Sequence, residues 1–391
     1  MKKPDCLIIE CCDYMTYPPG GQLSFARQMM SIFGNRLGLV GVSTDGSPVG
    51  RWINTHIDGE AYYLFNIGHR DATIKKPLIP SRLSGLLQLA RYQSRIMGLG
   101  VSNLFIQAPE LLMVASKWDL GSICYRFPGI GNPLEMPRYA WGKPLAGLFD
   151  KALFRALRKV ECILACADDR AIEGLAARSS GVLTIDRIIK FPTRVDTELF
   201  KPMSKAALRS VLNLDRFDKL IAVCGRINRV KGWDFVLDAF KQLSVDETST
   251  GLVFVGDGED RPRLEQMVAD FSLTEQVIIT GFQPPDLVVK YLNAADIAVV
   301  GSHEEGWSIA MLEAMACGKP VVSTYVSGAK DMIHNGQNGF VVEDRNAKQF
   351  ASAIIDGLCL PDPNPVSLAV AEKYALKFLK ADLQDICPFL R

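Results

Sequence analysis

Two glutamates separated by seven residues are the strongest candidates for chemistry in this sequence. Glu305 and Glu313 lie in the stretch GSHEEGWSIAMLEAMACGKP, residues 301–320. The apolar run before it, residues 296–300, is typical of a buried parallel strand. Ser308 is a candidate N-cap for a helix that a later glycine and proline end. The spacing therefore predicts one carboxylate just before a helix start, where free amides and the helix dipole favour a phosphate, and one inside the helix.

A second group of candidate binding residues follows an apolar run at residues 220–224. Arg226 and Lys231 suit phosphate oxygens, because arginine offers a planar fork of donors and lysine a compact charge. A Gly-x-Gly at residues 256–258 invites a dinucleotide-binding interpretation. Arg261 stands where the last glycine of that motif belongs, so we reject a dehydrogenase.

The elements that must position these residues are those of an α/β protein. Short apolar runs alternate with helical segments, as in doubly wound parallel sheets, and 391 residues with 48% hydrophobic content suffice for two such domains. Gly20 and Gly21 lie where the first strand meets a helix, at the sheet edge where open α/β sheets bind ligands. We expect strands at 4–12, 38–43, 103–106, 122–125, 160–165 (the last of the first sheet), 220–224, 252–255, 277–280, 296–300, 321–322 and 339–342, and helices at 22–33, 81–97, 141–160, 233–243 and 369–390.

Composition excludes several classes of protein. No stretch approaches the roughly eighteen apolar residues of a membrane span, so we expect neither an anchor nor a signal peptide, and a cytoplasmic location. Ten scattered cysteines lack zinc-site spacing and have only four histidines as co-ligands, which favours reduced thiols. The net charge of +1 argues against a nucleic-acid partner.

The charge is uneven along the chain. Residues 1–192 carry 23 basic and 16 acidic side chains, and residues 193–391 carry 21 and 27. The helices expected at 81–97 and 141–160 each have a basic face, which is either solvated or bound to an anionic membrane at about 1 kcal/mol per basic residue. The apolar faces that we expect to be buried are Leu83, Leu86, Leu87 and Ala90 on the first helix, and Leu145, Leu148, Phe149, Ala152, Leu153, Ala156 and Leu157 on the second.

The stretch EGWS…LEAMACGKPVV resembles the glutamate-x7-glutamate signature of retaining GT-B glycosyltransferases of glycosyltransferase family 4, and residues 225–232 resemble that family's GRxxxxKG. The resemblance covers nearly the whole chain and is strongest from Val195 to Val342. It implies two Rossmann-like doubly wound domains that face a central cleft. It also implies retaining transfer of a sugar from a UDP- or GDP-sugar, with Glu305, Arg226 and Lys231 as the catalytic residues.

The same resemblance assigns the donor contacts. Glu305 positions the sugar, Arg226 and Lys231 hold the diphosphate, and Glu313 binds the ribose hydroxyls. Because no Asp-x-Asp motif is present, we expect no metal and no cofactor. The remaining implied donor-binding residues are Gly20, Gly21, Gly306, Trp307, Ser308, Ile309 and Phe282.

On the acceptor side the sequence departs from the family. Family members commonly place a histidine near the end of the strand at 122–125, and Phe127 stands there instead. Glu110 and Arg126, at strand ends, are the candidates for acceptor binding, although ordinary salt bridging explains each equally well. We expect a glycan or lipid-linked acceptor in cell-surface polysaccharide synthesis, with peripheral contact at the inner face of the membrane.

Residues 194–202 resemble the family's interdomain turn. We therefore expect an N-terminal domain at 1–192, a C-terminal domain at 193–369, and a tail from about 370 to 391 that crosses back onto the first domain. Two alternatives stay open. A nucleotide-sugar 2-epimerase of the same fold would need acidic and histidine groups together, with His303 the only histidine nearby, and a non-catalytic GT-B partner subunit would keep the fold without the activity.

Overall fold

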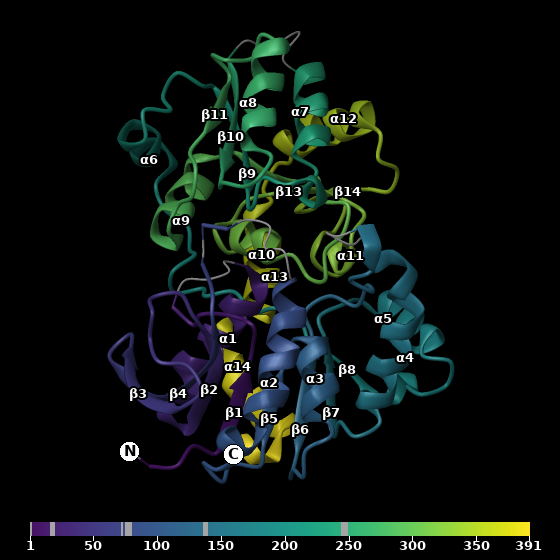
Figure 1. Ribbon diagram of the computed structural model, residues 1–391. Coiled ribbons are helices and arrows are strands. Elements are labelled where there is room, and N and C mark those ends of the chain that lie inside the picture. Colours follow the sequence, from purple (N-terminus) through teal and green to yellow (C-terminus); the bar gives the residue numbers. More distant parts are fainter. Residues whose placement is uncertain (1, 16–19, 72, 75–79, 136–139, 244–248) are drawn as a thin grey trace. The chain divides into compact units, whose positions relative to one another are not determined.

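The computed structural model describes residues 2–15, 20–71, 73–74, 80–135, 140–243 and 249–391 (Figure 1). The chain forms two compact units. Unit 1 comprises Met1–Pro192 with Phe378–Arg391, and unit 2 comprises Thr193–Lys377. The expected boundaries of independently folding domains, at 192/193 and near 370, stay a prediction.

Unit 1 is built on a sheet with eight strands among its described residues, in the order β3-β4-β2-β1-β5-β6-β7-β8. All neighbours pair in parallel except β3 and β4, which form a hairpin. The order reverses between β1 and β5, which is the switch point where open sheets bind ligands. The strands are β1 Cys6–Ile9, β2 Leu37–Ser43, β3 Trp52–Ile57, β4 Glu60–His69, β5 Leu104–Ile106, β6 Ile123–Phe127, β7 Cys162–Ala165 and β8 Ile188–Lys190.

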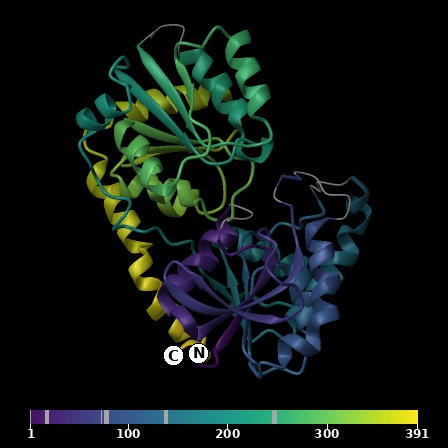
Figure 2. The ribbon, with the colours of Figure 1, turned by 60° about the vertical axis from the view of Figure 1, so that its left-hand side comes forward.

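Helices cover both faces of this sheet (Figure 2). On one face Phe25 stacks on Phe105, with ring centroids 5.8 Å apart. On the other, Leu7 and Ile9 share a core with Leu89. The helices are α1 Gly21–Phe33, α2 Ser81–Met97, α3 Pro109–Ala115, α4 Ala146–Leu157, α5 Asp169–Arg178 and α14 Leu379–Ile386, with short 3-10 turns η1 Gly34–Arg36, η2 Ala140–Leu145, η3 Ile185–Arg187 and η6 Pro388–Leu390.

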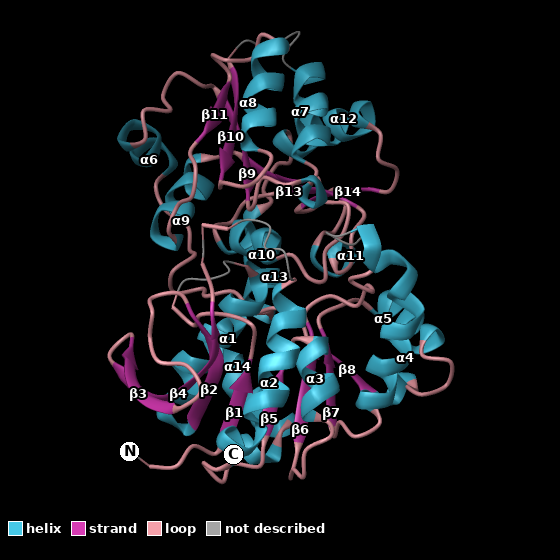
Figure 3. Cartoon of the chain, viewed as in Figure 1, coloured by secondary structure: helices cyan, strands magenta, loops and turns pink. Residues whose placement is uncertain are grey.

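Among its described residues, unit 2 contains a six-stranded parallel sheet in the order β11-β10-β9-β12-β13-β14, which reverses between β9 and β12. Figure 3 shows its strands in magenta and its helices in cyan. Its strands are β9 Lys219–Cys224, β10 Thr250–Val255, β11 Val277–Ile279, β12 Ile297–Val300, β13 Val321–Thr324 and β14 Gly339–Val342. Its helices are α6 Lys205–Val211, α7 Trp233–Leu243, α8 Arg261–Asp270, α9 Pro285–Ala294, α10 Ile309–Ala316, α11 Ala329–Met332, α12 Ala347–Leu358 and α13 Asn364–Lys373, with 3-10 turns η4 Arg229–Lys231 and η5 Leu376–Phe378.

The predicted fold class of two Rossmann-like doubly wound α/β domains is confirmed by these two sheets. Three details were wrong or missed. The first sheet does not end at residues 160–165, because β8 extends it. The hairpin β3–β4 was missed, although its Asp58-Gly59 turn, with φ of 51° and 85°, carries the Asp-Gly signal of a two-residue turn. The C-terminal tail is not one helix, because it breaks near Ala375, which forms a parallel bridge with Val195.

The expected apolar face of α2 is not its buried face. Leu83 and Leu87 are 40% and 58% exposed, whereas Gly85 and Leu89 are buried. A Cβ at Gly85 would lie 2.4 Å from Cys11 Sγ, so the helix packs closely at this glycine on the segment that follows β1. The close approach turns the two leucines outward.

Helix α4 shows the same error in part. Leu145 and Leu148, at its start, are 41% and 64% exposed, while Leu153 and Leu157 are buried as expected. Unit 1 therefore exposes leucines on two helices that both pack against α3. Among the described residues, no helix has the length and apolar content needed to span a membrane.

Candidate functional site

Two loops meet at the carboxyl edge of the unit 2 sheet, one after β9 (residues 225–232) and one after β12 (residues 301–308). The strands are neighbours, and His303 N donates a hydrogen bond to Val230 O at 2.8 Å. Gly232 has a φ of 62°, and a Cβ there would lie 2.0 Å from Gly301 O. Only glycine permits this approach of the two backbones, so the loops are held as a pair.

The paired loops bring two of the predicted catalytic residues into contact. Lys231 Nζ lies 2.6 Å from Glu305 Oε1, and Ser302 Oγ donates to the same oxygen at 2.7 Å. Asn228 Oδ1 accepts from Lys231 N at 3.0 Å and shapes the turn that presents the lysine. The Glu305 side chain is only 11% exposed, so this ion pair is partly shielded from water.

The loop that carries Glu305 is anchored through its backbone oxygens by residues that were not identified from the sequence. Arg345 donates from Nη1 to Gly301 O at 2.7 Å and to Ser302 O at 3.0 Å. Thr324 Oγ1 donates to Ser302 O at 2.7 Å. No motif pointed to Arg345, because it follows β14 and reaches the loop only through the fold.

Helix α10 begins directly after this loop, as predicted. Ser308 is its N-cap residue, in an extended conformation and without a side-chain cap hydrogen bond, and the helix ends at Ala316 before Gly318. Its first-turn amides and positive dipole end therefore lie beside the loop that carries Glu305. Gly306 and Ile309, at the loop and the first helical position, are half-buried.

Glu313 lies within α10, and burial raises the pKa of its carboxyl to about 8. The carboxyl also contributes, after burial, to a raised pKa of the Cys224 thiol, which places it beside the end of β9. From there the chain continues directly into Gly225 and Arg226, and Arg226 is exposed. A largely protonated carboxyl at neutral pH can both donate and accept a hydrogen bond with a hydroxyl.

Trp307 and Phe282 differ in exposure. The indole of Trp307 is buried against Tyr374, with ring centroids 5.3 Å apart, and a Cβ at Gly328 would lie 2.6 Å from the indole. The side chain therefore packs in the interior, and a donor contact of Trp307 would come from its backbone. Phe282 follows Gly281 at the end of β11 and is 70% exposed, so its ring is accessible to a ligand.

The Gly-x-Gly after β10 serves packing between loops. A Cβ at Gly256 would lie 1.9 Å from Gly225 O, and a Cβ at Gly258 would lie 2.0 Å from Ile227 O. Both glycines let this loop pack on the backbone of the loop after β9. Their presence is explained without a dinucleotide phosphate, in agreement with our rejection of a dehydrogenase.

In unit 1, Gly20 and Gly21 lie at the start of α1, the first as its N-cap residue and the second as its first residue. Both are exposed, and the space around the Cβ position of Gly21 is open. Residues 16–19, which precede them, lie outside the described residues. The role of this pair in donor binding stays a prediction.

The two acceptor candidates differ in accessibility. Arg126 is 2% exposed, donates from Nη1 to Gln107 Oε1 at 2.8 Å, and lies over the Phe25 ring. It is an internal residue of unit 1, and its role in acceptor binding stays a prediction. Glu110 lies in the first turn of α3, and its Oε1 atom is 3.8 Å from Arg82 Nη1. Phe127 is buried and apolar, so it does not replace the family's histidine as a polar group.

A buried acid at the unit 1 switch point was missed. Glu10 follows β1 directly, is 3% exposed, and accepts a hydrogen bond from Gln107 N at 2.8 Å. Burial raises the pKa of this carboxyl to about 8 despite the Gln107 hydrogen bonds and the nearby Arg82 and Arg126, which lower it. The sequence signal was available, because Glu10 interrupts an apolar strand at its carboxyl end.

Comparison with known proteins finds matches over the part of unit 2 that contains these loops. The family model described as "Glycosyl transferases group 1" matches residues 204–365, which include both loops and α10. The chain is 32% identical over 178 residues to a D-inositol 3-phosphate glycosyltransferase of Acidothermus cellulolyticus, an alignment that covers 43% of this chain and 40% of the relative. A relative of the same name from Geodermatophilus obscurus is 33% identical over 180 residues, covering 43% and 39%.

Solved structures match over the whole length. Sucrose-phosphate synthase from Thermosynechococcus elongatus superposes with a TM-score of 0.80 at 19% identity, covering 100% of this chain and 99% of that one. The chain has the GT-B fold. HepE from Anabaena, a second GT-B neighbour, was solved in complex with UDP and glucose and superposes with a TM-score of 0.73 at 16% identity, covering 98% of each chain.

The chain spans about two fifths of the length of the curated relatives that it matches. Within the described residues, no group of three or more His, Cys, Asp or Glu side chains is arranged to hold a metal ion.

Proposed function

We propose that the protein is a retaining glycosyltransferase of glycosyltransferase family 4, which moves a sugar from a UDP- or GDP-sugar to a glycan or lipid-linked acceptor. One observation carries the proposal. Lys231 and Glu305, which are 74 residues apart in the chain, meet at 2.6 Å at the carboxyl edge of the unit 2 sheet, beside the start of α10. The match to the glycosyl transferases group 1 model spans residues 204–365, a range that contains both residues.

The donor diphosphate is held by positive charge from three sources. Arg226 supplies a guanidinium fork, Lys231 a compact ammonium, and the start of α10 its amides. In this proposal Glu313 binds the ribose hydroxyls. The HepE structures, which contain UDP or UDP-glucose, support a uridine nucleotide among the donors considered. We propose that this charge neutralises the leaving group without a metal.

Donor binding must rearrange the Lys231–Glu305 pair. The diphosphate competes with Glu305 for the ammonium, while Ser302 Oγ continues to hold Glu305 Oε1. Glu305 is then available to position the sugar. In the proposed front-face displacement, the bond from the anomeric carbon to the diphosphate breaks, the bond to the acceptor oxygen forms on the same face, and the acceptor proton passes to the departing phosphate oxygen.

Exposed side chains on α2 and α4 of unit 1 support the proposal of a lipid-linked acceptor. Leu83, Leu87 and Leu148 are exposed within the first two turns of α2 and α4, on helices that also carry Arg91 and Lys151. Exposed apolar side chains beside basic ones are the composition of a peripheral membrane surface. We therefore propose a cytoplasmic protein that binds the inner face of an anionic membrane and acts in cell-surface polysaccharide synthesis.

The anomeric configuration of the product tests the proposal. UDP-glucose and GDP-mannose are incubated separately with the protein, and the sugar first released to water is followed by proton NMR. A retaining transferase releases the α-anomer from an α-linked donor before mutarotation. Initial release of the β-anomer would contradict retention, and an epimerised nucleotide sugar would favour the epimerase. No turnover of either donor, with nucleoside diphosphate still bound, would favour the non-catalytic subunit.

A further inference from the structure

A cavity of about 400 Å³ lies at the amino edge of the unit 2 sheet, the edge opposite the Lys231–Glu305 pair. Three of its lining residues stand at the beginnings of strands: Lys219 starts β9, Asp296 precedes β12, and Lys319 lies just before β13. Lys205, the first residue of α6, and Asn364, the first of α13, complete the polar lining.

The cavity is cationic in an otherwise acidic unit. Residues 193–377 carry 19 Lys+Arg and 25 Asp+Glu, a net charge of −6. The cavity lining has the opposite balance, with three lysines and one aspartate. A net positive lining favours an anion and opposes a metal ion, for which the single carboxylate is too few ligands.

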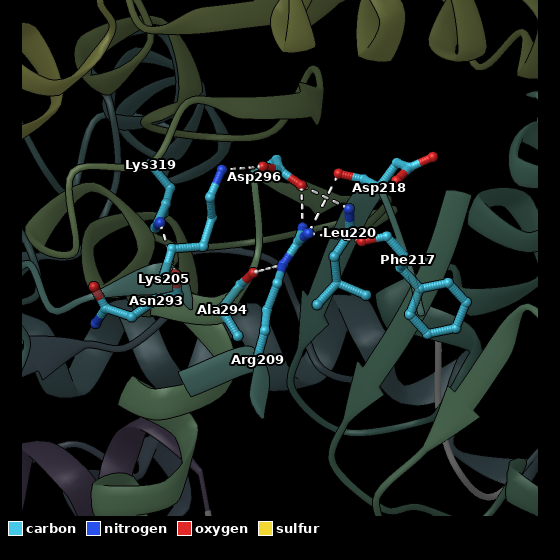
Figure 4. Close-up of polar contacts among 9 residues, drawn as sticks. All are labelled: Lys205, Arg209, Phe217, Asp218, Leu220, Asn293, Ala294, Asp296 and Lys319. Carbon is cyan, nitrogen blue, oxygen red and sulfur yellow. Dashed lines mark hydrogen bonds and ion pairs between the residues drawn. The ribbon is translucent and has the colours of Figure 1, made fainter. Parts of the chain in front are cut away.

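Two charged residues at this edge are already fully engaged (Figure 4). Arg209 and Asp296 form an ion pair at 2.5 Å, and Asp296 also accepts from Leu220 N at 2.7 Å. These two residues tie α6 to the starts of β9 and β12 and form the frame of the cavity. The other acceptors of Arg209 are Ala294 O, Phe217 O and Asp218 O, at 3.0, 2.7 and 3.3 Å.

Lys205 and Lys319 retain donors. Among the described residues, Lys205 Nζ reaches Asp296 Oδ1 at 2.7 Å and Lys319 Nζ donates to Asn293 O at 2.9 Å, one contact for each ammonium of three donors. Burial lowers the pKa of Lys319 to about 8; Lys205 and Arg209 act in the same direction, and Cys317 and Asp296 offset only part of this effect. The positive charge of Lys319 is therefore poorly compensated, and an anion beside it would stabilise it.

The start of α13 also favours an anion in the cavity. Pro363 is its N-cap residue and provides no side-chain cap, and both Pro363 and Asn364 line the cavity. The positive end of the helix dipole therefore faces the space that the lysines line. The ammonium groups of Lys205 and Lys319, which belong to separate segments, and the start of α13 therefore lie around the same cavity.

We propose that this cavity is a second anion site, which binds a small phosphate-type anion (inorganic phosphate or a phosphomonoester) through Lys205, Lys219 and Lys319. The site is independent of donor binding, although α10 connects the two regions: its start lies beside Glu305 and the residues after its end, Cys317 to Lys319, line the cavity.

Calorimetric titration with inorganic phosphate and, separately, with glycerol 3-phosphate tests the site. Because the Arg226 and Lys231 side chains also attract phosphate, the parent protein for the experiment is the double variant R226A/K231A. We expect it to retain one anion site. Adding K205Q/K219Q, or K319M, should weaken binding about tenfold or more, since each change removes hydrogen bonds to a charged group. K348M, at an exposed lysine of α12 outside the cavity, is the matched control and should leave binding unchanged.

The outcomes separate this proposal from the proposed function. Loss of all phosphate binding in R226A/K231A, or equal binding by the parent and the cavity variants, would overturn the second site. If the cavity variants lose phosphate while R226A/K231A loses no nucleotide affinity, the second site stands and the donor site fails. UDP or GDP binding by K205Q/K219Q in the otherwise wild-type chain shows that unit 2 is folded. Binding of phosphate but not of glycerol 3-phosphate would restrict the ligand to the free ion.

Discussion

Different kinds of contact stabilise the carboxyl edge of the unit 2 sheet and the carboxyl edge of the unit 1 sheet. In unit 2 the loops after β9, β10 and β12 meet through backbone atoms, at Gly232, Gly256 and Gly258. In unit 1 the edge at the switch point is held by buried side chains, with Glu10, Gln107 and Arg126 in one hydrogen-bonded chain. Backbone contacts at glycines cannot titrate and tolerate no added atoms, whereas the buried carboxyl of Glu10 can titrate.

Because the contacts differ, different kinds of substitution should disrupt each edge. The unit 2 edge is specified by short motifs in which glycines and charged residues lie a few positions apart. The unit 1 edge depends on Glu10 and Gln107, which are 97 residues apart and meet only in the folded sheet. Changes to backbone shape should therefore break the unit 2 edge, and changes of charge or pH should break the unit 1 edge.

The largest expected effect is on turnover at the unit 2 edge. E305Q keeps the shape of the side chain but removes the charge that pairs with Lys231, and loss of one preorganised group of this kind costs roughly 10²–10³ in rate. We expect release of nucleoside diphosphate from the donor to fall by this factor, with nucleotide affinity nearly unchanged, as measured by a coupled assay and calorimetry. E304Q, at the exposed neighbouring position, is the control and should retain activity. Full turnover by E305Q would remove Glu305 from the mechanism.

The next largest effect concerns the backbone contact between the loops. In G232A the new Cβ meets Gly301 O, so the two loops must separate, in addition to the roughly 1–2 kcal/mol cost of a left-handed alanine. We expect a lower free energy of unfolding and loss of the stabilisation by nucleotide. G336A is the matched control, because Gly336 has a φ of 77° but nothing within 4 Å of its Cβ position. Both variants are compared by chemical denaturation with and without UDP or GDP, and equal behaviour would show that the close approach is unimportant.

A smaller, pH-dependent effect is expected at the unit 1 edge. The pKa of Glu10 is raised by burial to about 8, so the folded state holds its proton more tightly than the unfolded state. The contribution of Glu10 to the free energy of unfolding is therefore largest below about pH 4.5 and falls as the pH rises to about 8. Relative to wild type, E10Q should be more stable at pH 9 and similar at pH 5 in thermal unfolding. E173Q, at an exposed position of α5, should show no such pH dependence, and a pH-independent difference for E10Q would contradict the burial account.

The smallest effect is expected at the exposed leucines of unit 1. L87S removes an apolar side chain that is 58% exposed, so it should leave the free energy of unfolding nearly unchanged. Binding to vesicles with anionic lipid should weaken several-fold, because full burial of a leucine contributes roughly 1.5–3 kcal/mol. I355S, at a residue of unit 2 that is 52% exposed, is the control in vesicle sedimentation. Equal binding by all three proteins would exclude this surface as the membrane contact.

Much of unit 2 could be predicted from its sequence. The bounds of α7, the cap at Ser308 and the end of α10 before Gly318 matched the predictions, because local signals specify them: a cap residue, an apolar period and a terminating glycine. The candidate residues Lys231 and Glu305 were identified through motifs, and their contact at 2.6 Å follows from the adjacency of β9 and β12.

The errors came where distant packing decides the outcome. The bounds of α2 matched the prediction, but its buried side did not: the helix packs at Gly85 against Cys11, a contact that no local pattern contains. Arg345 and Thr324, which anchor the Glu305 loop, were missed for the same reason. In the tail, a bridge between Val195 and Ala375 interrupts what composition alone predicts as one helix.

The central claim is that the loops 225–232 and 301–308 with α10 bind a nucleoside diphosphate, and a thermal-shift series with UDP, GDP, ADP and NAD tests it most directly. A ligand at 100 times its dissociation constant stabilises the folded state by about 2.7 kcal/mol. We predict that UDP or GDP raises the melting temperature most and that R226A abolishes the shift. A response to none of the diphosphates, or a shift that R226A leaves intact, would contradict the account.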